Sequence, residues 1–220
     1  FMAYIASAEA ALDTDTILAE SMLSAKNVVL TMPFIDGEPL GRPDEDLPEY
    51  VLRNRLAENN IIDNPNTNPE RSYPSSMVDT FAPIPAVGEN AANIGALVSL
   101  LDADGGIRSE PLIVDYYVDY YPSAALILAA KSLNLGLDDI KVTMGSDVQL
   151  GQLTIKTDKN SRMKTFFYSS DTYEGAFPVD SFFDVIEGKI PVSKYKDKIV
   201  LIGATAFGVG NTMVTPIDPA

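Results

Sequence analysis

The sequence predicts an α/β fold: a layered sheet with parallel strands, flanked by helices and extended by an antiparallel meander section. Two continuous apolar runs, Val28–Met32 and Lys198–Ile202, are typical of parallel strands that are buried on both faces. A nearly all-apolar segment, Ala124–Leu133, has the pattern of a helix that is packed on several sides. We therefore expect the two apolar runs to be parallel strands of one sheet.

Capping residues and apolar patterns predict the first helix and the first strand. Asp13 or Asp15 is placed to cap a helix over residues 14–26, which carries one apolar stripe. The strand Val28–Met32 follows, and Pro33 is expected to stop it. Residues 33–76 then hold seven of the 15 prolines and are expected to form an irregular insertion, a candidate lid over a ligand site. Only Asp46–Asn59 keeps a helical pattern there.

The later elements alternate between hairpin, helix and meander. The turn around Asp102–Gly106 favours a β-hairpin between the flanking runs, and Ser123 is expected to cap the apolar helix. Asp180 is expected to cap a short helix that runs to Glu187. The predicted meander strands are Ile140–Thr143, Gln152–Thr157 and Thr165–Tyr168.

Composition limits the function. The 220 residues carry a net charge of −15, which disfavours nucleic acid as a partner. The sequence has no His, Cys or Trp, so the usual Ser-His-Asp triad, cysteine nucleophiles and zinc sites built on His or Cys are excluded. Paired carboxylates show no spacing that marks an acid and a base. We expect no catalytic residues, no cofactor and no metal.

A glycine-rich stretch after the Lys198–Ile202 run is the first candidate ligand site. A strand that runs into such a turn places backbone N–H groups at the carboxyl edge of a sheet. The stretch is not a P-loop, because Val209 and Gly210 stand where Lys and Ser or Thr are required. A simple chain reversal, a small-ligand loop and a phosphate cradle remain open. The candidate ligand-binding residues are Thr205, Phe207, Gly208, Gly210 and Asn211.

Two further candidates lie nearer the middle of the chain. Arg108 follows an Asp-Ala-Asp turn that resembles the opening of a calcium loop, or is simply a turn stabilised by its aspartates. Tyr116 belongs to a cluster of four tyrosines, a pattern found both in ligand pockets and in ordinary packing.

Five blocks of the sequence share the order and spacing of motifs found together in one family. They are Asn27–Leu30; Asp102–Arg108 with Pro111–Leu112; Tyr121–Leu126; Asp184–Pro191; and Tyr195–Ala206 with Thr215–Pro216. Over nearly the whole chain this set resembles the CHASE2 family of sensor domains. The resemblance implies an extracytoplasmic input domain of a bacterial receptor, held in the membrane through flanking helices. The receptor's output would be an adenylate cyclase, a histidine kinase or a serine/threonine kinase.

The chain is thus expected to be a single CHASE2-like domain over residues 1–220, truncated at both ends, with residues 33–76 inserted. The family normally has a further βα unit before residue 1 and a helix after Pro216. The expected partners are an unknown small molecule or ion, and a second copy of the chain as a candidate homodimer. The alternatives are a periplasmic or secreted carboxylate- or metal-dependent hydrolase and a dimerisation module without a ligand.

Overall fold

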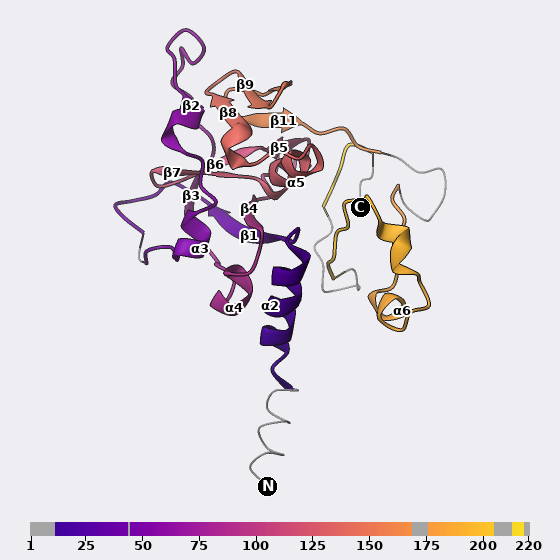
Figure 1. Cartoon of the computed structure of the whole chain (residues 1–220). Coiled ribbons are helices and arrows are strands. Elements are labelled where there is room, and N and C mark those ends of the chain that lie inside the picture. Colours follow the sequence, from indigo (N-terminus) through magenta and orange to yellow (C-terminus); the bar gives the residue numbers. More distant parts are fainter. Residues whose placement is uncertain (1–11, 44, 169–175, 205–212, 218–220) are drawn as a thin grey trace. The chain divides into compact units, whose positions relative to one another are not determined.

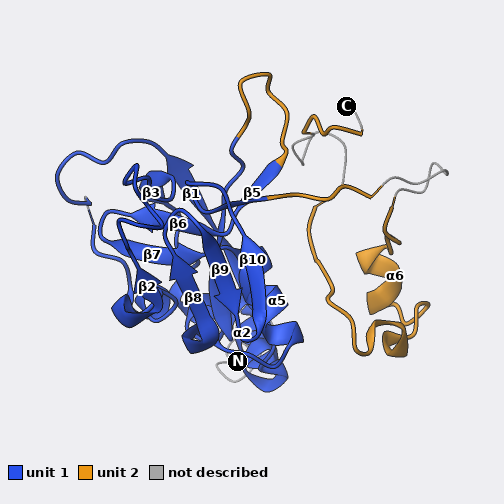
Figure 2. Cartoon of the chain, turned by 90° about the horizontal axis from the view of Figure 1, so that it is seen from above, with its two compact units in different colours: residues 1–100, 109–163 blue, residues 101–108, 164–220 orange. Residues whose placement is uncertain are grey.

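The computed structural model describes residues 12–43, 45–168, 176–204 and 213–217. The chain divides into two compact units, residues 1–100 with 109–163 and residues 101–108 with 164–220 (Figure 2), and each is described by itself. The helices are α2 (Thr14–Ala25), α3 (Glu49–Leu52), α4 (Pro85–Gly88), α5 (Ala124–Ser132) and α6 (Phe182–Ile186), with single 3₁₀ turns η1 (Glu58–Asn60), η2 (Leu137–Asp139) and η3 (Val192–Tyr195) (Figure 1). The strands are β1 (Val29–Asp36), β2 (Ile61–Ile62), β3 (Ser76–Thr80), β4 (Asn93–Leu97), β5 (Ser109–Pro111), β6 (Ile113–Tyr116), β7 (Asp119–Pro122), β8 (Ile140–Thr143), β9 (Asp147–Leu150), β10 (Leu153–Lys156) and β11 (Arg162–Lys164).

The main sheet of the first unit has the strand order β4-β1-β3-β6-β7. β1 is parallel to β4 and antiparallel to β3, whereas β3 is parallel to β6. The core of this sheet gathers Met32, Phe34, Met77, Ile94 and Tyr121, each 6% exposed or less. The predicted α/β class, with parallel and antiparallel strands flanked by helices, is confirmed.

The first apolar run is a parallel strand, as predicted, but two details of the prediction are wrong. β1 continues through Pro33 to Asp36, because the Pro33 carbonyl still accepts hydrogen bonds from the Thr80 hydroxyl (2.7 Å) and the Phe81 amide (3.3 Å). β1 also buries only one face here, since Met32 and Phe34 point into the core while Thr31 is exposed. A continuous apolar run did not require cover on both sides.

The predicted strand over Lys198–Ile202 is wrong. These residues form no strand, and Leu201 and Ile202 are 82% and 79% exposed. Nor can they be the neighbour of β1, because both edges of β1 are already occupied, one by β4 and the other by β3. Apolar character alone does not fix a pairing partner.

The predicted hairpin is displaced along the chain. β4 pairs with β1 rather than with the segment after Gly106, although the Asp102 amide does donate to the Gly106 carbonyl across the turn (2.9 Å). The hairpin instead joins β6 and β7, with Tyr116 opposite Asp119. Its two-residue turn holds Tyr117 at a φ of 59°, a left-handed conformation usually given to Asn or Gly. Because the turn contains neither Asn nor Gly, its residue types do not predict a hairpin turn at this position.

The second sheet contains two of the three predicted meander strands, as β8 and β10, and β9, which the sequence did not predict, lies between them. Its order is β10-β9-β8-β2, with antiparallel pairs from β8 to β10 and β2 added in parallel to β8. Ile140, Val142, Val148 and Leu150 form its buried face. The predicted third strand, Thr165–Tyr168, is wrong, because these residues form no strand; β11 ends just before them, at Lys164, and pairs with β5.

Most predicted caps are present. The Asp13 carboxylate accepts from the Thr16 amide (3.1 Å) at the start of α2, and the Ser123 hydroxyl oxygen accepts from the Leu126 amide (3.2 Å) at the start of α5. Helix α6 is capped by Ser181 rather than by Asp180. The Asp180 carboxylate is instead engaged by Lys194 and by the Tyr195 hydroxyl. Asp46–Asn59, predicted to be helical, is helical only over α3 and η1.

The close approach of α5 to β4 yields a test of the packing. A methyl group at Gly95 would lie 2.5 Å from the Ala124 Cα, which is backbone and cannot move aside cheaply. We expect Gly95→Ala to destabilise the protein by about 2 kcal/mol. Urea unfolding followed by tyrosine fluorescence measures the loss. Gly136→Ala is the matched control, since its nearest neighbour atom would be 3.9 Å away; equal unfolding midpoints for the two variants would contradict the packing.

Candidate functional site

The segment that carries α3 and η1 is held against the main sheet by one buried amide. Asn54 is 1% exposed, and its Nδ2 donates to the Tyr50 carbonyl (2.8 Å). Its Oδ1 accepts from the Ile94 amide (2.9 Å) and from the Asn93 Nδ2 (3.2 Å). Asn54 thus satisfies backbone groups of two elements at once and fixes residues 49–56 beside β4.

Arg53 adds a second anchor on the same side. Its Nη2 donates to the carbonyls of Gly88 (3.3 Å), Glu89 (3.1 Å) and Ala91 (2.8 Å). Gly88 and Glu89 lie at the end of helix α4, where unpaired acceptors favour a cation, and Ala91 lies three residues beyond the helix. At the other end of the segment the Asn60 Nδ2 donates to the Leu137 carbonyl (3.2 Å).

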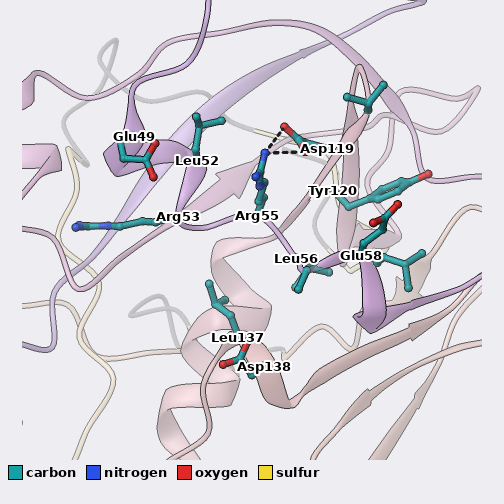
Figure 3. Close-up of a pocket in the computed structure, with 13 residues that line it drawn as sticks. Glu49, Leu52, Arg53, Arg55, Leu56, Glu58, Asp119, Tyr120, Leu137 and Asp138 are labelled. Atoms are coloured by element: carbon teal, nitrogen blue, oxygen red, sulfur yellow. Dashed lines mark hydrogen bonds and ion pairs between the residues drawn. The ribbon is translucent and has the colours of Figure 1, made fainter.

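The anchored segment forms one wall of a cleft of about 1020 Å³. The other walls come from the β6–β7 turn and from η2, so we call it the hairpin cleft (Figure 3). Leu56 is buried, and Leu52, Ile61 and Leu137 are half-buried. The cleft is lined by Glu49, Leu52, Arg53, Arg55, Leu56, Ala57, Glu58, Ile61, Val118, Asp119, Tyr120, Leu137 and Asp138.

The charges of the hairpin cleft are mixed. Figure 3 shows the Arg55 guanidinium reaching to Asp119, at 3.3 Å from each carboxylate oxygen. Glu49, Glu58 and Asp138 form no ion pair within the part of the chain that the structure describes. A polar rim over partly apolar walls is the usual make-up of a small-molecule site.

Tyr120 lines the hairpin cleft, and it also connects the β6–β7 hairpin to the anchored segment. Its carbonyl accepts from the Leu56 amide (2.8 Å), which ties the β6–β7 hairpin to the anchored segment. Burial raises the pKa of its phenol to about 12, and the nearby Asp115, Tyr73 and Asp63 contribute. The phenol is therefore neutral at physiological pH and can act as a hydrogen-bond donor.

A second, smaller cleft of about 480 Å³ lies in the same unit. It is lined by Asp36, Gly37, Glu38, Tyr73, Pro74, Ser75, Ser76, Asn160 and Arg162, and we call it the Arg162 cleft. No residue lines both clefts.

The pKa of Asp115, on β6, is affected by acidic residues of both clefts. Its Oδ1 is buried and has no hydrogen-bond partner in the described part of the chain. Burial, followed by the negative charges of Asp119 and Glu38, raises the pKa of Asp115 to about 6. Asp119 lines the hairpin cleft and Glu38 lines the Arg162 cleft, so this carboxyl is placed to respond to either.

The candidate residues chosen from the sequence lie elsewhere. Arg108 is engaged by Asp104 (2.7 Å) and Asp102 (2.9 Å), so the Asp-Ala-Asp segment is a turn closed by an arginine. Tyr116 is 7% exposed and packs edge-on against Phe34. Neither lines a cleft described above. Thr205, Phe207, Gly208, Gly210 and Asn211 lie outside the described residues, and their role stays a prediction.

Sequence reasoning did not find the cleft residues. The Asp46–Asn59 pattern did indicate an ordered piece within the proline-rich segment, and that piece became the wall. Arg53 and Asn54 lie on it but have no motif around them. Within the described residues, no cluster of three or more acidic side chains could hold a metal ion. None of the helices described there has the length and apolar character needed to cross a membrane.

Comparison with models of known protein families shows which family the chain belongs to. The CHASE2 domain family model matches residues 4–220, essentially the whole sequence, so the chain belongs to the CHASE2 family. CHASE2 domains are extracellular sensory domains. Neither the curated proteins nor the solved structures contain a significant match.

The raised pKa of Asp115 predicts a specific dependence of stability on pH. Because the folded pKa, about 6, exceeds the ordinary 3.8, the carboxyl contributes stability that is full below pH 3.8 and is lost as pH rises to about 6. Asp115→Asn removes this contribution. We expect the variant to gain about 1 kcal/mol over the wild type at pH 7, relative to the difference at pH 4. Urea unfolding at both pH values measures it; a difference that does not change with pH would contradict the assignment.

Proposed function

We propose that this chain is the extracytoplasmic input domain of a bacterial transmembrane receptor and binds a small ligand in the hairpin cleft. Its own role is recognition, and an adenylate cyclase, histidine kinase or serine/threonine kinase in the cytoplasm provides the output. Membership of a sensory domain family is the observation that carries this proposal. Helices that flank the domain would hold it in the membrane.

The hairpin cleft supports the proposed ligand site. Its volume of about 1020 Å³ is close to the upper end of the range for small-molecule sites. Three lining carboxylates, those of Glu49, Glu58 and Asp138, form no ion pair with described residues and are available to a ligand. The wall is fixed by Asn54 and Arg53, so little order must be gained on binding.

The lining of this cleft favours binding over catalysis. It contains no Ser, Thr, Cys or Lys, and the raised pKa of Tyr120 makes its phenol a poor nucleophile. A hydrolase would need a nucleophile or an activated water beside an acid–base pair. Among the residues that line the cleft, no Ser, Thr, Cys or Lys nucleophile stands beside the carboxylates.

A ligand in the hairpin cleft can change the output only if it binds the two receptor states with different affinity. The cleft joins three segments that are far apart in sequence, namely residues 49–61, 118–120 and 137–138. A ligand that contacts all three would favour the receptor state in which their spacing matches it. Coupling of about 1–3 kcal/mol is typical for such a switch.

A thermal-shift screen with amines, organic acids, sugars and metal ions tests the proposal. A ligand at 100 times its Kd should add about 2.7 kcal/mol of stability. Glu49→Gln, Glu58→Gln and Asp138→Asn should each weaken the hit while leaving the unliganded melting temperature nearly unchanged. Glu20→Gln is the matched control, because Glu20 is exposed on α2 and does not line the cleft.

Two results would contradict this site. A ligand whose affinity is the same in all three cleft variants and in the wild type binds elsewhere. A screen without hits, combined with a stable dimer by analytical ultracentrifugation, would favour the dimerisation module.

A further inference from the structure

The Arg162 cleft is a separate feature from the proposed sensory site. Three segments build it: the end of β1 with the turn after it, the residues leading into β3, and the residues around the start of β11. All of them belong to the first unit. At about 480 Å³ the cleft is within the range that holds small ligands.

One side of this cleft presents hydrogen-bond donors. The Arg162 Nη2 donates to the Ser75 Oγ (2.8 Å), and the Arg162 amide is fixed by the Asp158 carboxylate (2.9 Å). The Arg162 Nε is buried with no hydrogen-bond partner, and its guanidinium makes no ion pair with any described residue. Arg162 lines the cleft without an anionic partner among the described residues, and a carboxylate is the acceptor that fits a guanidinium in pairs.

Ser75 strengthens the donor side. It is 9% exposed and lines the cleft, and its oxygen accepts from Arg162. A hydroxyl has one hydrogen to donate as well as two lone pairs. The Ser75 hydroxyl can therefore donate a hydrogen bond to the same acceptor as Arg162.

The other side of the cleft presents carboxylates. Asp36 and Glu38 form no ion pair with the described residues. The pairing of β1 with β3 shifts between Ile35 and Asp36, an irregularity that turns the following residues out of the regular ladder. The Gly37 amide then donates to the Ser76 carbonyl (3.0 Å), which holds the turn at the mouth of the cleft.

Opposite charges therefore line one cleft without neutralising each other: neither Asp36 nor Glu38 is within 4.0 Å of the Arg162 guanidinium. An inorganic anion in this cleft would face two unpaired carboxylates, and a metal ion would face an arginine. A ligand that carries both charges satisfies both sides.

We propose that the Arg162 cleft binds a free α-amino acid. Its carboxylate binds to Arg162 and Ser75, and its ammonium group binds to Asp36 or Glu38. The exposed Tyr73, whose hydroxyl is fixed by Asp63 (2.9 Å), and Asn160 surround the position of the amino acid side chain. Their polarity favours a polar side chain over a large apolar one.

Isothermal titration calorimetry of the full chain with the proteinogenic L-amino acids, one at a time up to about 10 mM, tests this. At least one polar amino acid should bind. Its N-acetyl derivative lacks the ammonium charge and its methyl ester lacks the carboxylate charge, so each should bind at least tenfold more weakly, about 1.4 kcal/mol. These two probes test the charges without changing the protein.

Variants then locate the site. Arg162→Gln and the double variant Asp36→Asn/Glu38→Gln should each weaken binding by about tenfold or more. Ser75→Ala should weaken it in the same direction, and this variant tests the donor side should Arg162→Gln not fold. Glu58→Gln, in the hairpin cleft, should leave amino acid binding unchanged. The proposal is overturned if no amino acid binds, if N-acetylation leaves affinity intact, or if Glu58→Gln abolishes binding while the Arg162 cleft variants do not. None of these results decides whether the hairpin cleft binds a different ligand.

Discussion

The buried side chain of Asn54 is the contact on which the arrangement of the first unit depends. A side-chain amide that is 1% exposed must satisfy its donors and its acceptor internally, and Asn54 does so with backbone groups of α3 and of β4. Without it, the Ile94 amide would lose its acceptor in a buried position, at a cost of about 1–3 kcal/mol. The segment that walls the hairpin cleft is thus part of the fold and not a loose insertion.

The β6–β7 hairpin connects the segment anchored by Asn54 to the rest of the main sheet. Tyr120 binds the anchored segment through its carbonyl, and Asp115, opposite it in register, lies beside β3 and responds to the acids of both clefts. Ligand charge in either cleft would therefore alter the cost of keeping Asp115 ionised. Through this one carboxyl, the proposed amino acid site and the proposed sensory site share an electrostatic neighbour.

Much of the fold could be predicted from the sequence, but the clefts could not. Caps such as Asp13 and Ser123 are local chemistry, so they were visible, and so was the alternation of β8 and β10. Composition does not reveal which segments will pair when the partners are distant in sequence. For this reason the sequence did not predict the pairing of β1, the turn at Tyr117 or the absence of a strand over Lys198–Ile202. Arg53, Asn54 and Arg162 acquire their roles only when separate segments meet, and no spacing pattern marks them.

Hydrogen–deuterium exchange of individual backbone amides tests the central claim, that residues 49–60 form a fixed wall. We expect slow exchange at Ile94, whose amide donates to Asn54, and at Leu56, whose amide donates to the Tyr120 carbonyl. In Asn54→Ala both amides should exchange faster, while Val148 and Ile155, which pair between β9 and β10, stay protected. Fast exchange at Ile94 and Leu56 in the wild type, with the second sheet still protected, would contradict the account.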